Sequence, residues 1–248
     1  MLEKNYINNI IAIMPMAGRG QRFKRYGYEI PKPLIKVGIK PMFAKATESF
    51  PKNLKWIFIS QKEIKLYNIF KKSLRNFKKA KVIYLKKYTS GQANTVSKAI
   101  KFLTKSENII IHSCDLKFNI NFNDLKKKIK KYDVLVLTAQ GNKYNFNNPH
   151  SFSWVRKKKE NKIEISLKKN FKKNKKKSRV LIGSFVFKNK NVLKNCLQYI
   201  YRKKYKIKNE YYIDSAAMIA DKIGYTLGEL SVKKYVSWGS HAEFLKNK

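Results

Sequence analysis

The sequence is 248 residues long, is 43% hydrophobic and 13% aromatic, and carries a formal net charge of +42, from 57 Lys and Arg against 15 Asp and Glu. The hydrophobic content suffices for a core and excludes a wholly disordered chain, and the length suits one domain. The two cysteines, Cys114 and Cys196, exclude a disulfide framework and lack the spacing of a zinc site.

The sequence carries no signal for a membrane or for secretion. The first twenty residues lack the charged start, long apolar run and small-residue cleavage site of a secretory leader. No stretch approaches the roughly 18 consecutive apolar residues that a membrane-spanning helix needs. We therefore expect a cytoplasmic protein without a membrane partner.

In chain order, short apolar runs alternate with longer helical patterns through the first half. The predicted strands are 10–14, 56–59, 82–85, 108–111 and 134–137, and the predicted helices are 41–50, 63–77, 93–103 and 122–131. The second half predicts short antiparallel strands at 152–155 and 163–167, an exposed lysine-rich loop at 168–179, a strand at 180–187, helices at 192–201 and 211–223, a strand at 225–232 and a turn at 241–245. This pattern favours an α/β fold with a mostly parallel sheet covered on both faces.

A glycine-containing loop follows the first predicted strand. It reads MPMAGRGQRF from Met14 to Phe23, and PKPL follows at 31–34. Two glycines let backbone N–H groups approach phosphate oxygens closely, and Arg22 and Lys32 add the positive charge that phosphoryl or nucleotidyl transfer requires. The loop is neither a Walker loop nor GxGxxG. Ligands of parallel sheets bind at the carboxyl ends of strands, where this loop lies.

Two further segments carry polar residues at such positions. Thr89 to Thr95 reads TSGQANT before a predicted helix, which suits either polar recognition or simple capping. Asp115 directly follows the strand 108–111, where a carboxylate caps a turn or binds magnesium. His112 lies within the strand run and is expected to be packed or hydrogen-bonded.

In this order and spacing, these motifs resemble the sugar-phosphate nucleotidyltransferase (pyrophosphorylase) superfamily, whose opening pattern is close to AAGxG(S/T)RF…PKPL, and in particular its small single-domain bacterial branch. The resemblance implies a Rossmann-like mixed, mostly parallel sheet flanked by helices, with a small antiparallel acceptor-binding excursion. It also implies one domain over 1–248, with a nucleotide-binding half at 1–140 and an acceptor-binding half at 141–248.

The resemblance implies roles for particular residues. Arg22 and Lys32 would be catalytic, and Asp115 would hold Mg²⁺. Nucleotide binding would fall to Ala17, Gly18, Arg19, Gly20, Gln21, Gly91 and Gln92. Acceptor binding would fall to Gly183, Glu210 and a lysine after the strand 163–167, Lys168 or Lys169, of which Lys169 is taken.

The sequence departs from the family pattern at two positions. Gln21 replaces the usual Ser or Thr of the loop. Ser237 stands where many relatives carry a second metal-binding aspartate, so Asp214 is taken as the second ligand, with Glu229 or substrate phosphates and water as the alternatives.

The predicted reaction joins an NTP to a phosphorylated small molecule and releases pyrophosphate, with CTP or UTP favoured and a role in surface-polysaccharide precursor synthesis expected from the resemblance. A cytidylyltransferase for phosphocholine or another amine or amino-acid phosphate remains open, as does a homo-oligomer. A glycosyltransferase would usually show a DxD pair, and Asp115 has no acidic partner two residues before it. A nucleic-acid-binding protein would explain the charge. However, most of the cations are Lys and no binding motif matches, so only nonspecific binding is expected.

Overall fold

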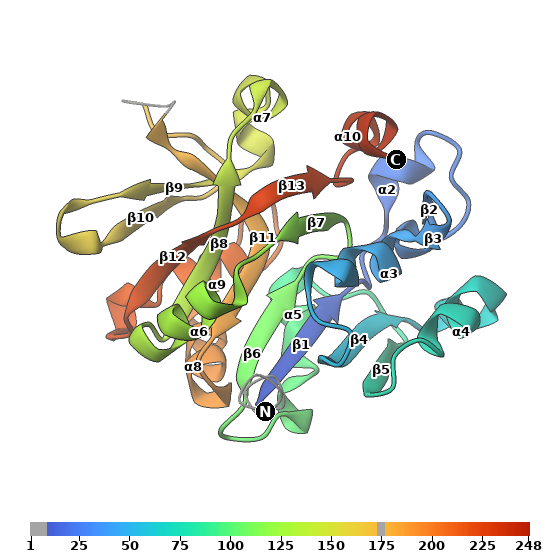
Figure 1. Ribbon diagram of the computed structural model, residues 1–248, viewed down its shortest axis with the longest axis horizontal. Helices are drawn as coiled ribbons and strands as arrows, with labels where there is room; N and C mark the ends of the chain where they lie inside the picture. The colour runs from blue at the N-terminus through green and yellow to red at the C-terminus, as the bar shows by residue number, and fades with distance from the viewer. Residues whose placement is uncertain (1–8, 173–176) are drawn as a thin grey trace.

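The computed structural model describes residues 9–172 and 177–248 and centres on one large sheet (Figure 1). Its strands are β1 (Ile10–Pro15), β4 (Lys55–Gln61), β5 (Ala80–Leu85), β6 (Asn108–His112), β8 (Val134–Gln140), β9 (Ser153–Lys157), β10 (Ile163–Ser166), β11 (Arg179–Phe187) and β12 (Leu227–Ser231). Along the sheet the order is β10-β9-β11-β6-β1-β4-β5, and β8 pairs with both β11 and β12.

The sheet is mixed and mostly parallel, as predicted. β1 pairs in parallel with β4 and β6, β4 pairs in parallel with β5, and β8 pairs in parallel with β12. β11 runs antiparallel to β6, β8 and β9, and the hairpin of β9 and β10 extends the sheet. Because β1 and β6 are parallel neighbours, the glycine loop and Asp115 leave the sheet at the same edge.

Helices cover both faces of the sheet. One face packs against α3 (Met42–Ala46), α4 (Asn68–Leu74) and α6 (Phe122–Lys131), and the other packs against α5 (Gln92–Ser97), α8 (Lys190–Arg202) and α9 (Ile213–Met218). Successive side chains of a strand point to opposite faces of the sheet, so each buried strand contributes to the hydrophobic core on both faces. In β1, Ala12 and Met14 join one hydrophobic cluster while Ile11 and Ile13 join the other.

Short elements complete the chain around the carboxyl edge. They are α2 (Gln21–Lys24), the β2–β3 hairpin (Lys36–Val37 and Lys40–Pro41), α7 (Lys143–Asn147), α10 (His241–Asn247) and the antiparallel pair of β7 (Leu116–Asn119) with β13 (Lys233–Ser237). The 3-10 turns are Lys32–Leu34, Thr47–Ser49, Lys62–Leu66, Ile100–Phe102, Pro149–Ser151, Lys159–Asn161 and Asp221–Ile223. In Figure 1 the β7–β13 pair lies at the same end of the sheet as α2 and α10. Within the described residues, no helix is long and apolar enough to cross a membrane.

Four predicted helices are shorter than the sequence pattern suggests. The one expected over 41–50 ends as α3 at Ala46 and continues only as a 3-10 turn. The helix expected over 63–77 is interrupted at Tyr67, whose backbone is extended (φ −89°, ψ 118°). The one expected over 93–103 ends as α5 at Ser97 and continues only as a 3-10 turn. The one expected over 211–223 starts late, because Tyr211 makes backbone hydrogen bonds to a neighbouring loop instead.

The lysine-rich segment 168–179 is less exposed than expected. Phe171 is 8% exposed and Ser178 is 1% exposed, and the Ser178 hydroxyl donates to Asn170 at 2.8 Å. Residues 173–176 of this segment lie outside the described part of the chain, as do residues 1–8 of the region searched for a leader.

The prediction that His112 is a packed histidine is confirmed. Its side chain is fully buried in β6, and its two ring nitrogens lie 2.7 Å from the Ser184 hydroxyl and 3.1 Å from the Ala46 carbonyl oxygen. Burial lowers the pKa of His112 to about 4, so the ring is neutral at neutral pH. Its role is to join β6, β11 and α3 below the site.

Glu48 binds three lysines and joins α3 to β7. Its carboxylate lies 2.6 Å from Lys117, 2.8 Å from Lys40 and 3.1 Å from Lys45. Burial alone would raise the pKa of Glu48, but the hydrogen bonds from these lysines outweigh it and lower the pKa to about 2.

Glu48→Gln is expected to reduce the free energy of unfolding by about 2 kcal/mol at pH 7. Because the folded-state pKa lies below the unfolded value of about 4.5, this stabilisation is complete above pH 4.5 and disappears as the pH falls toward 2. Urea unfolding of both proteins between pH 7 and pH 2.5 measures it. A difference that stays constant with pH would contradict the ionic origin.

Candidate functional site

A cleft of about 800 Å³ opens at the carboxyl edge of the sheet. The loop after β1, the loop before α5 and the residues after β6 line one part of it, and residues from the second half of the chain line the rest. The residues to which the sequence analysis assigned a role line this cleft, apart from Lys169 and the alternative metal ligand Glu229, although they come from distant parts of the chain.

The course of the glycine loop is fixed by the backbone conformation of Gly20 and by hydrogen bonds to the loop. Gly20 adopts a left-handed conformation (φ 65°), from which α2 begins, and its carbonyl accepts from the N–H of Phe23. Phe23 is buried below the loop, and Gln61 donates to the Ala17 carbonyl at 3.0 Å. The loop from Ala17 to Gln21 therefore borders the cleft without filling it.

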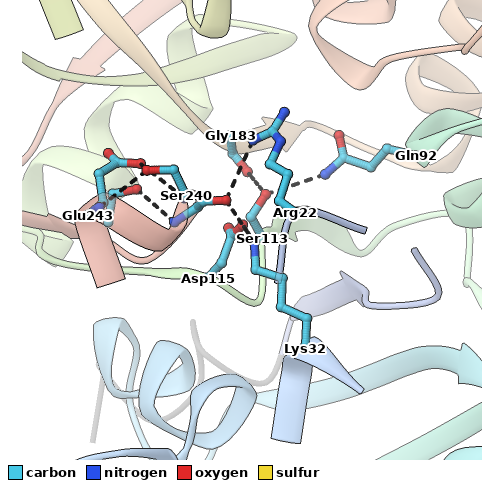
Figure 2. Close-up of polar contacts among 10 residues, drawn as sticks. Arg22, Lys32, Gln92, Ser113, Asp115, Gly183, Ser240 and Glu243 are labelled. Atoms are coloured by element: carbon cyan, nitrogen blue, oxygen red, sulfur yellow. Dashed lines mark hydrogen bonds and ion pairs between the residues drawn. The ribbon is translucent and has the colours of Figure 1, made fainter. Parts of the chain in front are cut away.

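Lys32 and Asp115 form the centre of the site. The Lys32 ammonium donates to the Asp115 carboxylate at 2.6 Å and to the Gly239 carbonyl at 3.1 Å. Arg22 reaches the same carbonyl at 3.5 Å. Figure 2 shows Lys32 pointing toward Asp115, with Arg22 close to them. The three groups come from α2, the PKPL turn and the segment after β6, so the fold brings together Arg22, Lys32 and Asp115 as the sequence analysis expected.

The charge of Asp115 is fixed by its neighbours. Burial alone would raise the pKa of this carboxyl, but the charge and hydrogen bond of Lys32, helped by the charge of Arg22, hold it below its usual value. Asp115 is therefore ionised at neutral pH while 24% of its side chain remains exposed to the cleft. Burial raises the pKa of the adjacent Cys114 to about 12, so no thiolate is present beside it.

The segment before α5 is fixed by the second half of the chain. Gly91 has φ 113° and ψ 176°, and a Cβ atom there would lie 2.6 Å from both the backbone N and O of Tyr211. Two backbone hydrogen bonds hold this contact, from Tyr211 to the Ser90 carbonyl at 2.8 Å and from Ala93 to the Tyr211 carbonyl at 2.9 Å. Glycine is required at this position, and Gly91 and Gln92 both line the cleft.

A bulge in β11 links the two halves of the cleft. The pairing of β11 with β8 shifts register between Leu181 and Phe185, and Gly183 at the shift has φ 70°. The Gly183 carbonyl accepts from the Ser113 hydroxyl at 3.1 Å, and Gln92 donates to that hydroxyl at 3.4 Å (Figure 2). Gly183, named from the sequence as an acceptor-side residue, thus lies beside the nucleotide segment as well.

The part of the cleft that the sequence assigned to the acceptor contains acids and a lysine. Glu210 lines the cleft next to Tyr212, and burial with the Glu210 hydrogen bond raises the pKa of Tyr212 to about 12. Asp214 is 7% exposed and accepts from the Ser153 hydroxyl at 2.5 Å, with the Lys168 ammonium 3.9 Å away.

Of the two lysines considered after the strand 163–167, the structure places Lys168 in the cleft. Its side chain is half-buried and its ammonium lies 5.1 Å above the Tyr212 ring. Lys169 is exposed and does not line the cleft. β10 ends at Ser166, and Lys168 follows it in a bend with a positive φ of 52°, so the local backbone conformation there decides which of the two lysines faces the cleft.

The carboxylates of the cleft are placed so that one of them, rather than two, could bind a magnesium ion. Mg²⁺ is commonly held by one or two carboxylates together with water and substrate phosphates, and ionised, partly exposed Asp115 fits that role. Asp214 is engaged with Ser153 and Lys168 and makes no contact with Asp115 among the described residues. Glu229, the alternative, is bound by Thr138 and Arg179 outside the cleft.

Near Asp115, the described residues contain no cluster of three or more His, Cys, Asp or Glu side chains able to hold a metal. Three side-chain oxygens, from Ser237, Asp115 and Glu243, do gather around Gly239. Each lies within 3.6 Å of the position that a Cβ atom on Gly239 would take. Glu243, however, forms a capping box with Ser240 at the start of α10 (Figure 2).

Several lining residues escaped the sequence analysis. Lys208 belongs to a tight turn in which it and Asn209 both have positive φ. Tyr144 donates to Ser240 at 2.8 Å across the cleft. Neither residue lies in a recognisable motif, and only the S-x-x-E capping pattern from Ser240 to Glu243 could have been read from the sequence.

No protein-family model matches the sequence, and no curated protein matches it significantly. Solved structures do match over nearly the whole chain. A nucleoside-diphosphate-sugar pyrophosphorylase from Vibrio cholerae superposes with a TM-score of 0.78 at 18% identity, covering 95% of this chain and 98% of that one. The chain has the nucleotidyltransferase fold.

Two other solved structures agree. A protein assigned as a glucose-1-phosphate thymidylyltransferase from Bacillus anthracis has a TM-score of 0.72 at 17% identity, covering 96% of this chain and 93% of that one. An inositol-1-phosphate CTP transferase from T. maritima has a TM-score of 0.72 at 16% identity, covering 95% and 91%. The resemblance drawn from the motifs is therefore confirmed at the level of the nucleotidyltransferase fold.

Proposed function

We propose that this protein is a magnesium-dependent nucleotidyltransferase that couples an NTP to a phosphorylated small molecule and releases pyrophosphate. The observation that carries the proposal is the contact of Lys32 with Asp115 at 2.6 Å, beside Arg22 and the glycine loop at the carboxyl edge of the sheet. One carboxylate and two cations beside a loop suited to phosphates are what nucleotidyl transfer requires.

In this reaction the attacking phosphate oxygen of the acceptor is already anionic, so no general base is required. The work of the protein is to align the acceptor with the α-phosphorus and to neutralise charge on the leaving pyrophosphate. Arg22 and Lys32 would supply fixed positive charge, and the loop from Ala17 to Gln21 would orient the triphosphate. Mg²⁺ held by Asp115 would supply further charge neutralisation on the triphosphate oxygens.

For the acceptor we favour a phosphorylated sugar or polyol. Glu210, Asp214 and Ser153 offer oxygens for hydroxyl groups, and Lys168 offers a cation for the acceptor phosphate. Next to Glu210 and Asp214, the Tyr212 ring already has an ammonium group over it and offers no open aromatic face to a quaternary ammonium group. We therefore rank a phosphocholine-type acceptor second. A pyrimidine nucleotide and a role in polysaccharide precursor synthesis remain predictions.

The decisive experiment measures pyrophosphate release with Mg²⁺, each of CTP, UTP, GTP, ATP and dTTP, and pools of phosphorylated sugars, polyols and amines. Release with one NTP that requires a phosphorylated acceptor, and that is lost in Lys32→Ala, would establish the reaction. Silence with every NTP, together with tight nucleic-acid binding at physiological salt, would reject it in favour of the basic nucleic-acid-binding alternative.

Lys168→Ala is expected to raise the KM for the acceptor about tenfold, with little change in the KM for the NTP, because it removes a charge-assisted contact on the acceptor side alone. Lys169→Ala is the matched control, since it removes the same charge from the neighbouring exposed position. Steady-state kinetics with each substrate varied in turn provide the measurement. An equal effect of the two substitutions would contradict the assignment of Lys168.

A further inference from the structure

A second cavity, of about 460 Å³, lies between α5 and α8. Its lining comes from the end of α5, the 3-10 turn that follows it and one side of α8. It is distinct from the cleft, because α5 spans the distance between them: Gln92 at the start of α5 lines the cleft, and Ser97 at its end lines the cavity. The two share no lining residue.

The wall of this cavity is mostly apolar, and besides the lysines its polar lining residues are Ser97, Gln198 and Tyr201. Leu197 is 1% exposed and Ile100 is half-buried. The Tyr201 hydroxyl oxygen is buried and lies beside the Ser97 side chain, but it makes no hydrogen bond of normal geometry among the described residues. Burial raises the pKa of Tyr201 to about 12, against the smaller opposing interaction with Ser97, so the hydroxyl keeps its proton.

The rim of the cavity is positive. Lys98, Lys101 and Lys194 line it, all three are exposed, and none takes part in an ion pair among the described residues. The lining contains no Asp or Glu. An apolar wall with a buried donor and a cationic rim suits a molecule with an apolar body and a negative end.

We propose that the α5–α8 cavity binds a small organic anion, with a ring or short chain against Leu197 and Ile100 and a carboxylate, phosphate or sulfonate group toward the three lysines. Its volume lies in the range of small-molecule pockets, roughly 300–1,000 Å³. The proposal concerns a site outside the cleft, and it stands whether or not the chain transfers nucleotides.

The probe for the test is 8-anilinonaphthalene-1-sulfonate, an aromatic sulfonate whose fluorescence rises in apolar surroundings. It is titrated into the full-length protein at physiological salt, so that binding to the general positive surface is screened. The compared proteins are the parent, a cavity variant (Lys98→Ala, Lys101→Ala, Lys194→Ala), a surface control (Lys71→Ala, Lys72→Ala, Lys130→Ala) and a cleft variant (Arg22→Ala, Lys32→Ala).

The surface control removes the same number of charges from exposed positions on α4 and α6. We expect saturable binding of one probe per chain, weakened about tenfold in the cavity variant and unchanged in the surface control and the cleft variant. Tyr201→Phe is expected to weaken binding about threefold by removing the buried donor.

Three results would overturn the proposal. Equal affinity of the parent and the cavity variant would exclude the site, and equal loss in the surface control would assign binding to net charge alone. Loss in the cleft variant would place the probe in the cleft. If the cavity variant is poorly folded by its melting curve, the same three positions changed to Gln, which keeps the length of the side chains, replace it with the same expected result.

Discussion

Asp115→Asn is expected to lower nucleotidyl transfer by about three orders of magnitude. The substitution keeps the size of the side chain but removes the negative charge that binds Lys32 at 2.6 Å and that would hold Mg²⁺. The same substitution would also release Lys32 from its position beside the reacting phosphates. Pyrophosphate release under saturating substrates measures the turnover, and Mn²⁺ binding followed by electron paramagnetic resonance measures metal binding without turnover.

Asp124→Asn is the matched control, because it makes the same chemical change at an exposed position on α6. It should leave both readouts unchanged. Retention of full activity by Asp115→Asn would contradict the proposed site. Loss of activity with metal binding intact would instead assign Asp115 to the positioning of Lys32.

The sequence could name residues that the fold brings together where a motif or a buried strand marks them. Arg22 and Lys32 belong to the motif that carries the resemblance, and Asp115 follows a short apolar run that forms a buried strand of the sheet. The same logic could not choose between Lys168 and Lys169. Both follow a short strand, and a bend after it, in which Lys168 has a positive φ of 52°, decides which of them faces the cleft; no residue pattern marks that bend.

What the sequence did not predict depends on contacts between distant segments. The helix expected over 211–223 starts late because Tyr211 bonds to Ser90 and Ala93, more than a hundred residues earlier. β7 and β13 are four and five residues long and form a separate two-stranded sheet in the described part of the chain, so neither shows a strong pattern of its own. Such elements follow from tertiary pairing, and local propensity does not determine them.

The contact between Gly91 and Tyr211 leads to a second prediction with a large effect. Gly91→Ala is expected to lower the free energy of unfolding by about 3 kcal/mol and to weaken NTP binding by at least tenfold. Its backbone region is almost restricted to glycine, and the added Cβ atom would approach two backbone atoms of Tyr211 at 2.6 Å, which no side-chain rotation can relieve. Urea unfolding and nucleotide titration measure the two effects.

Gly224→Ala separates the two causes of that loss. Gly224 also has a positive φ, of 85°, but a Cβ atom there meets nothing within 4 Å, so the substitution is expected to cost only about 1 kcal/mol and to leave NTP binding intact. If Gly91→Ala costs no more than Gly224→Ala, the contact with Tyr211 does not hold the segment. A larger cost confined to Gly91→Ala, together with weaker NTP binding, means that the segment around Tyr211 positions the segment before α5 through one pair of backbone hydrogen bonds.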